Sequence, residues 1–97
     1  MTNKEFAELL EYIDTASDKF ENVTVYRVHS SYSPRSGKIS KITLKVNYTK
    51  DGKPLPKIIN GILPKNVIQR SQAFKSDECN KEIIVKWLDG FIEEKAS

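Results

Sequence analysis

The sequence predicts an α+β fold: an N-terminal helix, a three- or four-stranded antiparallel meander and a C-terminal helix, in one compact domain over residues 1–97. Two observations predict it. Apolar residues recur with a helical period at both ends of the chain, and they alternate with a period of two in the middle. Each helix must bury its apolar stripe, and the sheet offers one apolar face. We therefore expect both helices to pack on the same face, with the other face left open.

The N-terminal segment is predicted to be an amphipathic helix. Thr2 is a suitable N-cap, and Glu5 stands three residues later, where it completes a capping box. The acidic residues of the segment fall opposite its apolar stripe. That stripe consists of Phe6, Leu9, Leu10 and Ile13, and it continues through Ala16 and Phe20 if the helix runs on.

Two strands follow. The segment Val23–Ser31 is rich in β-branched and aromatic residues, which favour a pleated, half-buried surface. After a turn at residues 33–37, Ile39–Thr49 shows the most regular alternation in the chain. Its apolar side should face the core and its polar side should face water. The apolar side carries Ile42, Leu44, Val46 and Tyr48, and the polar side carries Lys41, Thr43, Lys45 and Asn47.

A third strand is predicted over Leu55–Ile62, after a hairpin turn at Asp51-Gly52. Pro54 and Pro56 lack a backbone donor, so this strand is expected at an edge. The segment 64–75 has two interpretations. We favour a short helix or irregular segment, and the alternative is a fourth strand over Val67–Phe74.

The C-terminal segment is predicted to be a core helix, capped by Ser76 or Asp77. Gly90 lies inside it and costs up to about 1 kcal/mol relative to alanine. The apolar residues span an arc of roughly 140°, wide enough for a principal core element. They are Ile84, Trp87, Leu88, Phe91 and Ile92.

Composition narrows the class of protein. Hydrophobic residues make up 38% of the 97 residues and charged residues 30%, which is typical of a soluble globular protein. No apolar run approaches the roughly 18 residues of a membrane span, so no membrane partner is expected. The single cysteine, Cys79, excludes an internal disulfide and favours a reducing compartment. We therefore expect a cytoplasmic location.

The charges are strongly segregated along the chain. Residues 22–76 contain eleven Lys or Arg and one acid, Asp51. Residues 1–21 contain six acids and two bases, and residues 77–97 contain six acids and three bases. Segregation of this kind indicates the charge of a partner rather than a fold. The basic middle of the chain predicts a polyanionic partner.

The predicted binding residues lie on the polar sides of the strands and at the hairpin tips. Lysines on exposed strands also protect sheets from edge-to-edge aggregation, so a purely protective role is the competing interpretation. The near absence of acids favours binding. The predicted set is Arg27, Arg35, Lys38, Lys41, Lys45, Lys50, Lys53 and Lys57.

Catalytic chemistry is not expected. His29 stands beside Ser30 and Ser31 in a predicted strand, where neighbouring residues point to opposite faces, so no nucleophile–base pair is expected. One histidine and one cysteine do not support a zinc site. We predict a non-enzymatic protein with no cofactor and no metal.

Three functions follow from the charge pattern. The first is a nucleic-acid-binding protein that contacts the phosphates of DNA or RNA. Double-stranded or structured forms are favoured, because most tyrosines of the basic region are expected in the core rather than free to stack on bases. The second is an accessory module or inhibitor of phage or plasmid type, which engages an acidic surface of a nucleic-acid-processing or defence enzyme. The third is homodimerisation of the monomer, with an acidic helix of one copy on the basic sheet of another.

Overall fold

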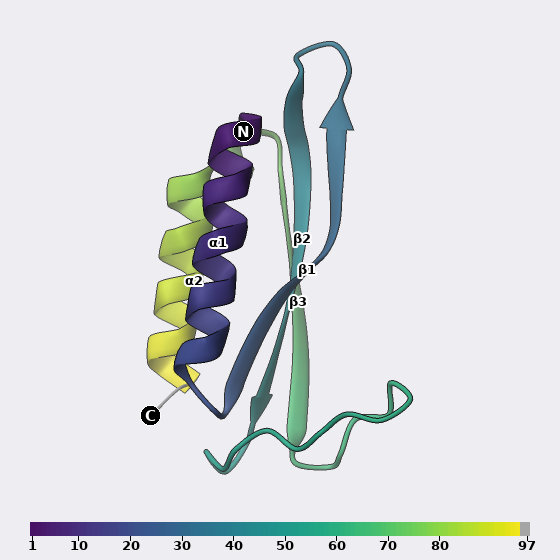
Figure 1. Ribbon diagram of the computed structural model, residues 1–97, viewed down its shortest axis with the longest axis vertical. Helices are drawn as coiled ribbons and strands as arrows, with labels where there is room; N and C mark the ends of the chain where they lie inside the picture. Colours follow the sequence, from purple (N-terminus) through teal and green to yellow (C-terminus); the bar gives the residue numbers. More distant parts are fainter. Residues whose placement is uncertain (96–97) are drawn as a thin grey trace.

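The computed structural model describes residues 1–95, so residues 96 and 97 of the predicted domain lie outside the described part. The elements are, in order, α1 (Asn3–Lys19), β1 (Val23–Ser33), β2 (Lys38–Thr49), β3 (Val67–Lys75), the 3-10 helix η1 (Ser76–Glu78) and α2 (Lys81–Lys95). The strands form one antiparallel sheet in the order β1-β2-β3. Both helices lie on one face of this sheet (Figure 1). The predicted α+β architecture is therefore confirmed, with three strands.

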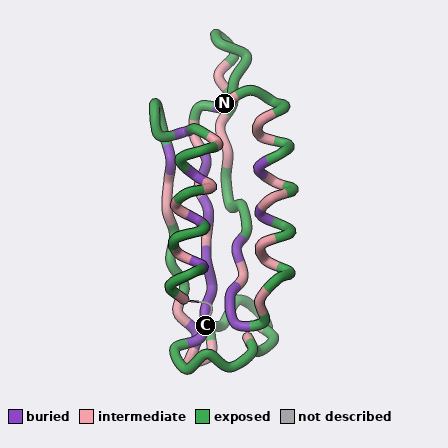
Figure 2. The backbone as a smooth tube through the Cα atoms, turned by 90° about the vertical axis from the view of Figure 1, so that its left-hand side faces the viewer, coloured by how far each residue is buried: buried purple, intermediate pink, exposed green. Residues whose placement is uncertain are grey.

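The central strand β2 organises the core. Ile42, Leu44 and Val46 are fully buried, and Tyr48 is 6% exposed. These residues alternate with polar residues that point to the other face, as the sequence predicts. Figure 2 shows the buried positions on the strands behind the two helices and on the inner sides of the helices. The outer face of the sheet has no helix on it.

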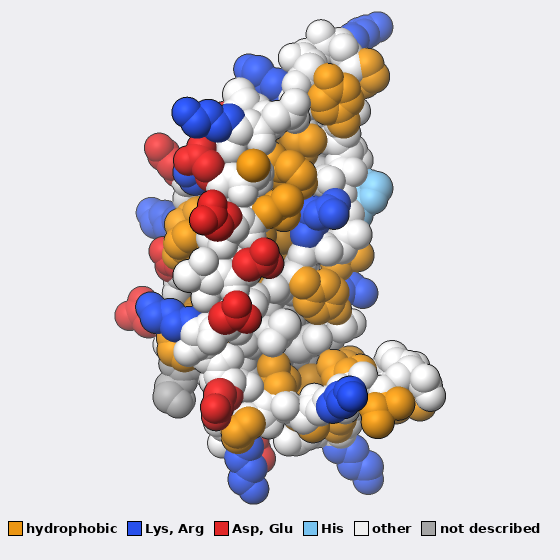
Figure 3. Space-filling view, viewed as in Figure 1, with side chains coloured by type: hydrophobic (Ala, Val, Ile, Leu, Met, Phe, Trp, Pro, Cys, Tyr) orange, Lys and Arg blue, Asp and Glu red, His pale blue; other side chains and the backbone are white. Residues whose placement is uncertain are grey.

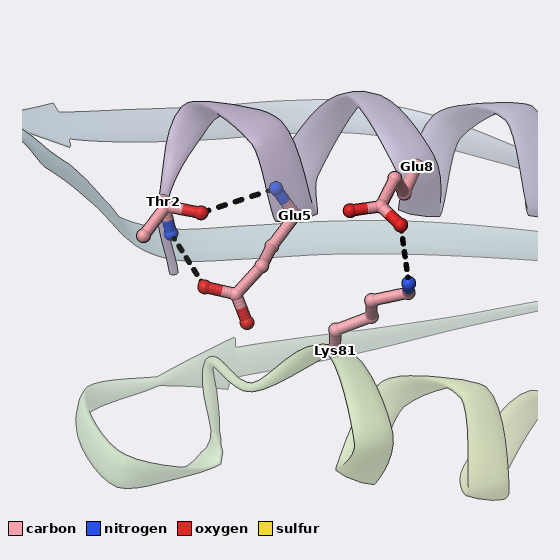
Figure 4. A network of polar contacts seen from close by, with 4 residues as sticks. All are labelled: Thr2, Glu5, Glu8 and Lys81. Carbon is pink, nitrogen blue, oxygen red and sulfur yellow. Dashed lines mark hydrogen bonds and ion pairs between the residues drawn. The ribbon is translucent and has the colours of Figure 1, made fainter.

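Helix α1 begins with the predicted capping box (Figure 4). The Thr2 hydroxyl accepts a hydrogen bond from the Glu5 backbone N–H at 3.1 Å, and the Glu5 carboxylate accepts one from the Thr2 N–H at 3.1 Å. The hydrogen bond from the Thr2 backbone is the main cause that lowers the pKa of Glu5. The helix then buries Leu9 and Ile13 against the sheet.

Helix α2 supplies the other half of the core. Ile84, Leu88 and Ile92 are buried. The Phe74 and Trp87 rings meet edge to face, with centroids 5.5 Å apart. Such aromatic pairs stabilise a core by about 0.5–1.5 kcal/mol beyond the area they bury. The predicted apolar arc of this segment is confirmed.

Two polar contacts join the helices on their outer side. The Lys81 ammonium lies 3.1 Å from the Glu8 carboxylate (Figure 4). The Tyr12 hydroxyl donates to the Asp89 carboxylate, and this hydrogen bond is the main cause that raises the pKa of Tyr12 to about 12. Both contacts are solvent-accessible, so they orient the helices more than they stabilise them.

The predicted third strand over Leu55–Ile62 is wrong. These residues belong to a long connection between β2 and β3, here called loop 50–66, whose only bridge is between Ile59 and Ile62. The position beside β2 is taken by Val67–Lys75, which pairs with it without interruption from Thr49 to Lys41. The strand alternative for the segment 64–75 is therefore correct, and the favoured helix or irregular segment is wrong. The expectation of an edge position was met by this later segment, because β3 is the edge strand next to β2.

The predicted caps of the last helix are also wrong. Ser76 and Asp77 lie in η1, and α2 starts only at Lys81. The Asn80 side chain accepts from the backbone N–H of Glu82 at 2.9 Å, as an N-cap residue does. Ser76 has a φ of +55°, and this left-handed residue redirects the chain from β3 into η1.

We expect Gly90→Ala to stabilise the protein by up to about 1 kcal/mol, because alanine has the higher helix propensity. Gly90 lies inside α2, and a Cβ atom at this position would meet nothing within 4 Å. Urea unfolding monitored by Trp87 fluorescence measures the change. A loss of stability would show that the backbone at Gly90 is not helical.

Candidate functional site

The surface opposite the helices is polar and nearly free of acids. Its members follow from the register, because residues directly opposite one another on paired strands share a face. We call this surface the open face. It consists of Thr24, Tyr26, His29 and Ser31 of β1, Lys41, Thr43, Lys45 and Asn47 of β2, and Gln69, Ser71, Ala73 and Lys75 of β3.

Two lysines of the open face lie directly opposite each other. Lys41 and Lys75 are cross-strand partners, and Lys45 follows on the same face of β2. No carboxylate among residues 1–95 lies within 4.0 Å of these three ammonium groups. Directly opposed like charges destabilise a sheet by a few tenths of a kcal/mol or more. The open face therefore concentrates positive charge at a cost to the fold.

Arg27 is not on this face. The register of β1 shifts between Arg27 and His29, so that Val28 forms a β-bulge. Before the bulge, Arg27 lies opposite Leu44 on the helix side, and its guanidinium is 5.8 Å from the centre of the Phe6 ring. After the bulge, His29 lies opposite Thr43 on the open face. The placement of Arg27 with Lys41 and Lys45 is therefore wrong.

The remaining predicted residues fall into two further groups. Arg35 and Lys38 lie at the β1–β2 connection, where both are exposed. Lys50, Lys53 and Lys57 belong to loop 50–66 at the other end of the sheet, and not to a tight hairpin or a third strand. Of the eight predicted residues, only Lys41 and Lys45 lie on the open face. Lys75, which is not one of the predicted site residues, joins them.

Short polar side chains connect the cations of the open face. The Gln69 amide donates to the Tyr26 hydroxyl and to the Asn47 side-chain oxygen, both at 3.1 Å. Most tyrosines of the basic region were expected in the core, but Tyr26 is 37% exposed and lies opposite Lys45. Tyr48 is buried as expected. The open face therefore offers one tyrosine ring, which is fewer than a stacking platform for single strands uses.

The helix side has the opposite charge. Figure 3 shows acidic side chains gathered over α1. The exposed acids of this helix are Glu8, Glu11, Asp14 and Asp18. The two sides of the molecule therefore differ in the sign of the charge that they present to solvent.

The structure brings His29 and Ser31 together, contrary to expectation. The His29 Nε2 atom lies 3.1 Å from the Ser31 hydroxyl, because residues two apart on a strand share a face. Both side chains are solvent-accessible. A catalytic serine also needs a group that orients the histidine, and the described residues give His29 no carboxylate partner.

The buried cysteine belongs to the core. Cys79 is 5% exposed, and its thiol donates to the Ile39 carbonyl oxygen at 3.5 Å. Burial raises the pKa of this thiol, which keeps it protonated and unreactive. No group of three or more potential metal ligands occurs within residues 1–95.

Comparison with known proteins adds no relative. No helix of the described chain is long and apolar enough to cross a membrane. No protein-family model, no curated protein and no solved structure matches the chain.

Proposed function

We propose that the chain is a small, non-enzymatic nucleic-acid-binding protein whose open face contacts the phosphate backbone. The observation that carries the proposal is the opposed pair of Lys41 and Lys75, with Lys45 on the same face and no carboxylate partner among the described residues. A pair that only protected the sheet from aggregation would not need two like charges directly opposite each other. A polyanion that bridges the two ammonium groups removes their repulsion.

The dimensions of the open face suit a backbone contact. Opposed Cα atoms of an antiparallel pair lie about 5 Å apart, and Lys41 and Lys45 are separated by about 13 Å along β2. Gln69, Ser71 and Thr43 lie among the lysines and supply hydrogen-bond donors that phosphate and sugar oxygens accept. With a single tyrosine on the face, recognition by shape and phosphates is favoured over base stacking. Duplex or structured DNA or RNA is thus the proposed ligand, and a cytoplasmic location belongs to the same proposal.

The second candidate is an acidic protein surface. The same lysines would face carboxylates of a partner, either an enzyme that the chain inhibits or the acidic α1 surface of a second copy. In that case the contact would be set by the shape of the partner and not by regularly spaced phosphates. Nothing on the open face favours an acidic protein surface over nucleic acid. An acidic protein partner is therefore the conclusion only if the test below finds no binding to nucleic acid.

The test is a salt titration of binding. We expect the protein to bind duplex DNA or RNA and to lose about 40-fold or more in affinity between about 50 and 200 mM salt, as three or more phosphate contacts require. Lys41→Gln and Lys45→Gln should each lower the slope of log K against log salt by about 0.9. Lys86→Gln, an exposed lysine of α2, is the matched control and should leave the slope unchanged. Fluorescence anisotropy with labelled oligonucleotides measures all four proteins.

Absence of binding to any nucleic acid at about 50 mM salt would overturn the proposal and favour the acidic protein surface. Light scattering of the same samples then separates a monomer from a dimer. An equal loss of slope in Lys86→Gln would show that the total charge, and not the open face, carries the binding.

We expect Lys75→Glu to stabilise the fold while it abolishes binding. The substitution replaces two opposed cations with an opposed ion pair, which is worth about 0.2–1 kcal/mol. Lys41→Glu should have the same two effects. The double variant Lys41→Glu, Lys75→Glu again places two like charges opposite each other, now two carboxylates. It should therefore lose the stability that each single variant gains. Urea unfolding gives the stabilities, and anisotropy gives the binding. Destabilisation by both single variants would contradict a repulsive contact between Lys41 and Lys75.

A further inference from the structure

The tip of loop 50–66 is a small, preformed β-hairpin. Ile59 and Ile62 are bridge partners across Asn60 and Gly61. The φ angles of these two central residues are +54° and +70°, which is the combination that a type I′ turn requires. Asn-Gly is the preferred dipeptide for that turn. The tip is thus a regular β-hairpin with a defined turn and not an irregular loop.

The hairpin tip presents apolar side chains to solvent. Ile59 is 64% exposed, Ile62 is 73% exposed and Leu63 is 37% exposed. None of the three belongs to the hydrophobic core or packs against it. Because the two isoleucines are directly opposed, their side chains lie on the same side of the small hairpin. The fold does not need these side chains, yet each exposes apolar surface to water.

Two exposed cations flank this apolar tip along the chain, and two more lie at the start of the loop. Lys57 precedes Ile59 by two residues and Lys65 follows Leu63 by two, and both lysines are exposed. Lys50 and Lys53 lie at the start of the loop, whose single acid is Asp51. The tip therefore fits a partner that has an anionic rim and an apolar interior.

Loop 50–66 and the open face meet at a corner. The loop first crosses the end of the sheet, where the Thr49 hydroxyl donates to the Lys53 carbonyl at 2.7 Å and the Leu55 N–H donates to the Glu21 carbonyl at 2.8 Å. Its tip then points away from the helices, on the side of the open face (Figure 1). In Figure 3 an apolar cluster marks this projection at the lower right.

We propose that loop 50–66 is a wedge that inserts Ile59 and Ile62 between stacked base pairs of duplex DNA bound along the open face. This inference rests on the proposed function. Apolar side chains that enter the minor groove unstack a base step and bend the duplex by about 20–90°. Phosphates on both sides of the groove meet Lys57 and Lys65, and the stacked bases meet the isoleucines.

The position of the hairpin tip beside the open face favours a duplex over a membrane as the partner. Lys41 and Thr49 are separated by about 26 Å along β2, which is less than one helical turn of DNA at about 34 Å. One duplex can therefore contact the lysines of the open face and the wedge together. A flat anionic bilayer that receives the tip leaves the open face without a partner, because the tip projects from that face.

The test uses a duplex of about 20 base pairs that carries 2-aminopurine at its centre and a fluorophore at each end. We expect the wild-type protein to raise the 2-aminopurine fluorescence and to shorten the end-to-end distance. The double variant Ile59→Ser, Ile62→Ser should lose both signals and bind about tenfold more weakly, with an unchanged salt slope. Ile83→Ser is the matched control, because Ile83 is an exposed isoleucine of α2 at 44% exposure. It should behave as the wild type.

Four outcomes would overturn the wedge. Duplex DNA binding without unstacking, or equal signals from the double variant, would remove the wedge and leave the proposed function intact. Unstacking of an RNA duplex alone would overturn the assignment to DNA. If no nucleic acid binds, the proposed function fails as well. Phosphatidylserine vesicles are the remaining probe, and binding that depends on Ile59 and Ile62 would then assign the tip to a membrane.

Discussion

The structure depends on one constraint, the burial of a single face of β2. Ile42, Leu44 and Val46 exclude water completely and bring both helices to the same side of the sheet. The free energy of this burial, about 1.5–3 kcal/mol for each large apolar side chain, exceeds that of any polar contact in the protein. The alternate residues, among them Lys41 and Lys45, are necessarily left on the other face. The core thus creates the open face as its direct consequence.

The distribution of charge follows the same division. Acids occupy the outer sides of the helices, and the sheet and its connections hold most of the bases (Figure 3). Two features of the surface do not contribute to the stability of the fold. Lys41 and Lys75 repel each other across a strand pair, and Ile59 and Ile62 expose apolar surface at a preformed turn. Each is unfavourable in the free protein, and under the proposed function duplex DNA would compensate both.

Sequence patterns predicted the parts of the fold that obey a regular period. The capping box at Thr2, the alternation of β2 and the apolar arc of α2 are local properties, and all are present in the structure. The misplaced parts depend on tertiary choices. The bulge at Val28 moves Arg27 to the helix side, and no local signal marks it. The edge beside β2 was open to two segments, and the local pattern of Leu55–Ile62 did not show that Val67–Lys75 would occupy it. Lys75 could therefore be placed on the open face only once its strand was known.

Amide chemical shifts during titration with duplex DNA test the central claim most directly. The account predicts that the largest changes occur at Lys41, Lys45, Ser71 and Lys75 and at the tip of loop 50–66, whereas the outer sides of α1 and α2 stay unchanged. The changes should reverse on addition of salt, because the contact is electrostatic. Changes centred on the helices, or none at the open face when DNA is in excess, would contradict the account.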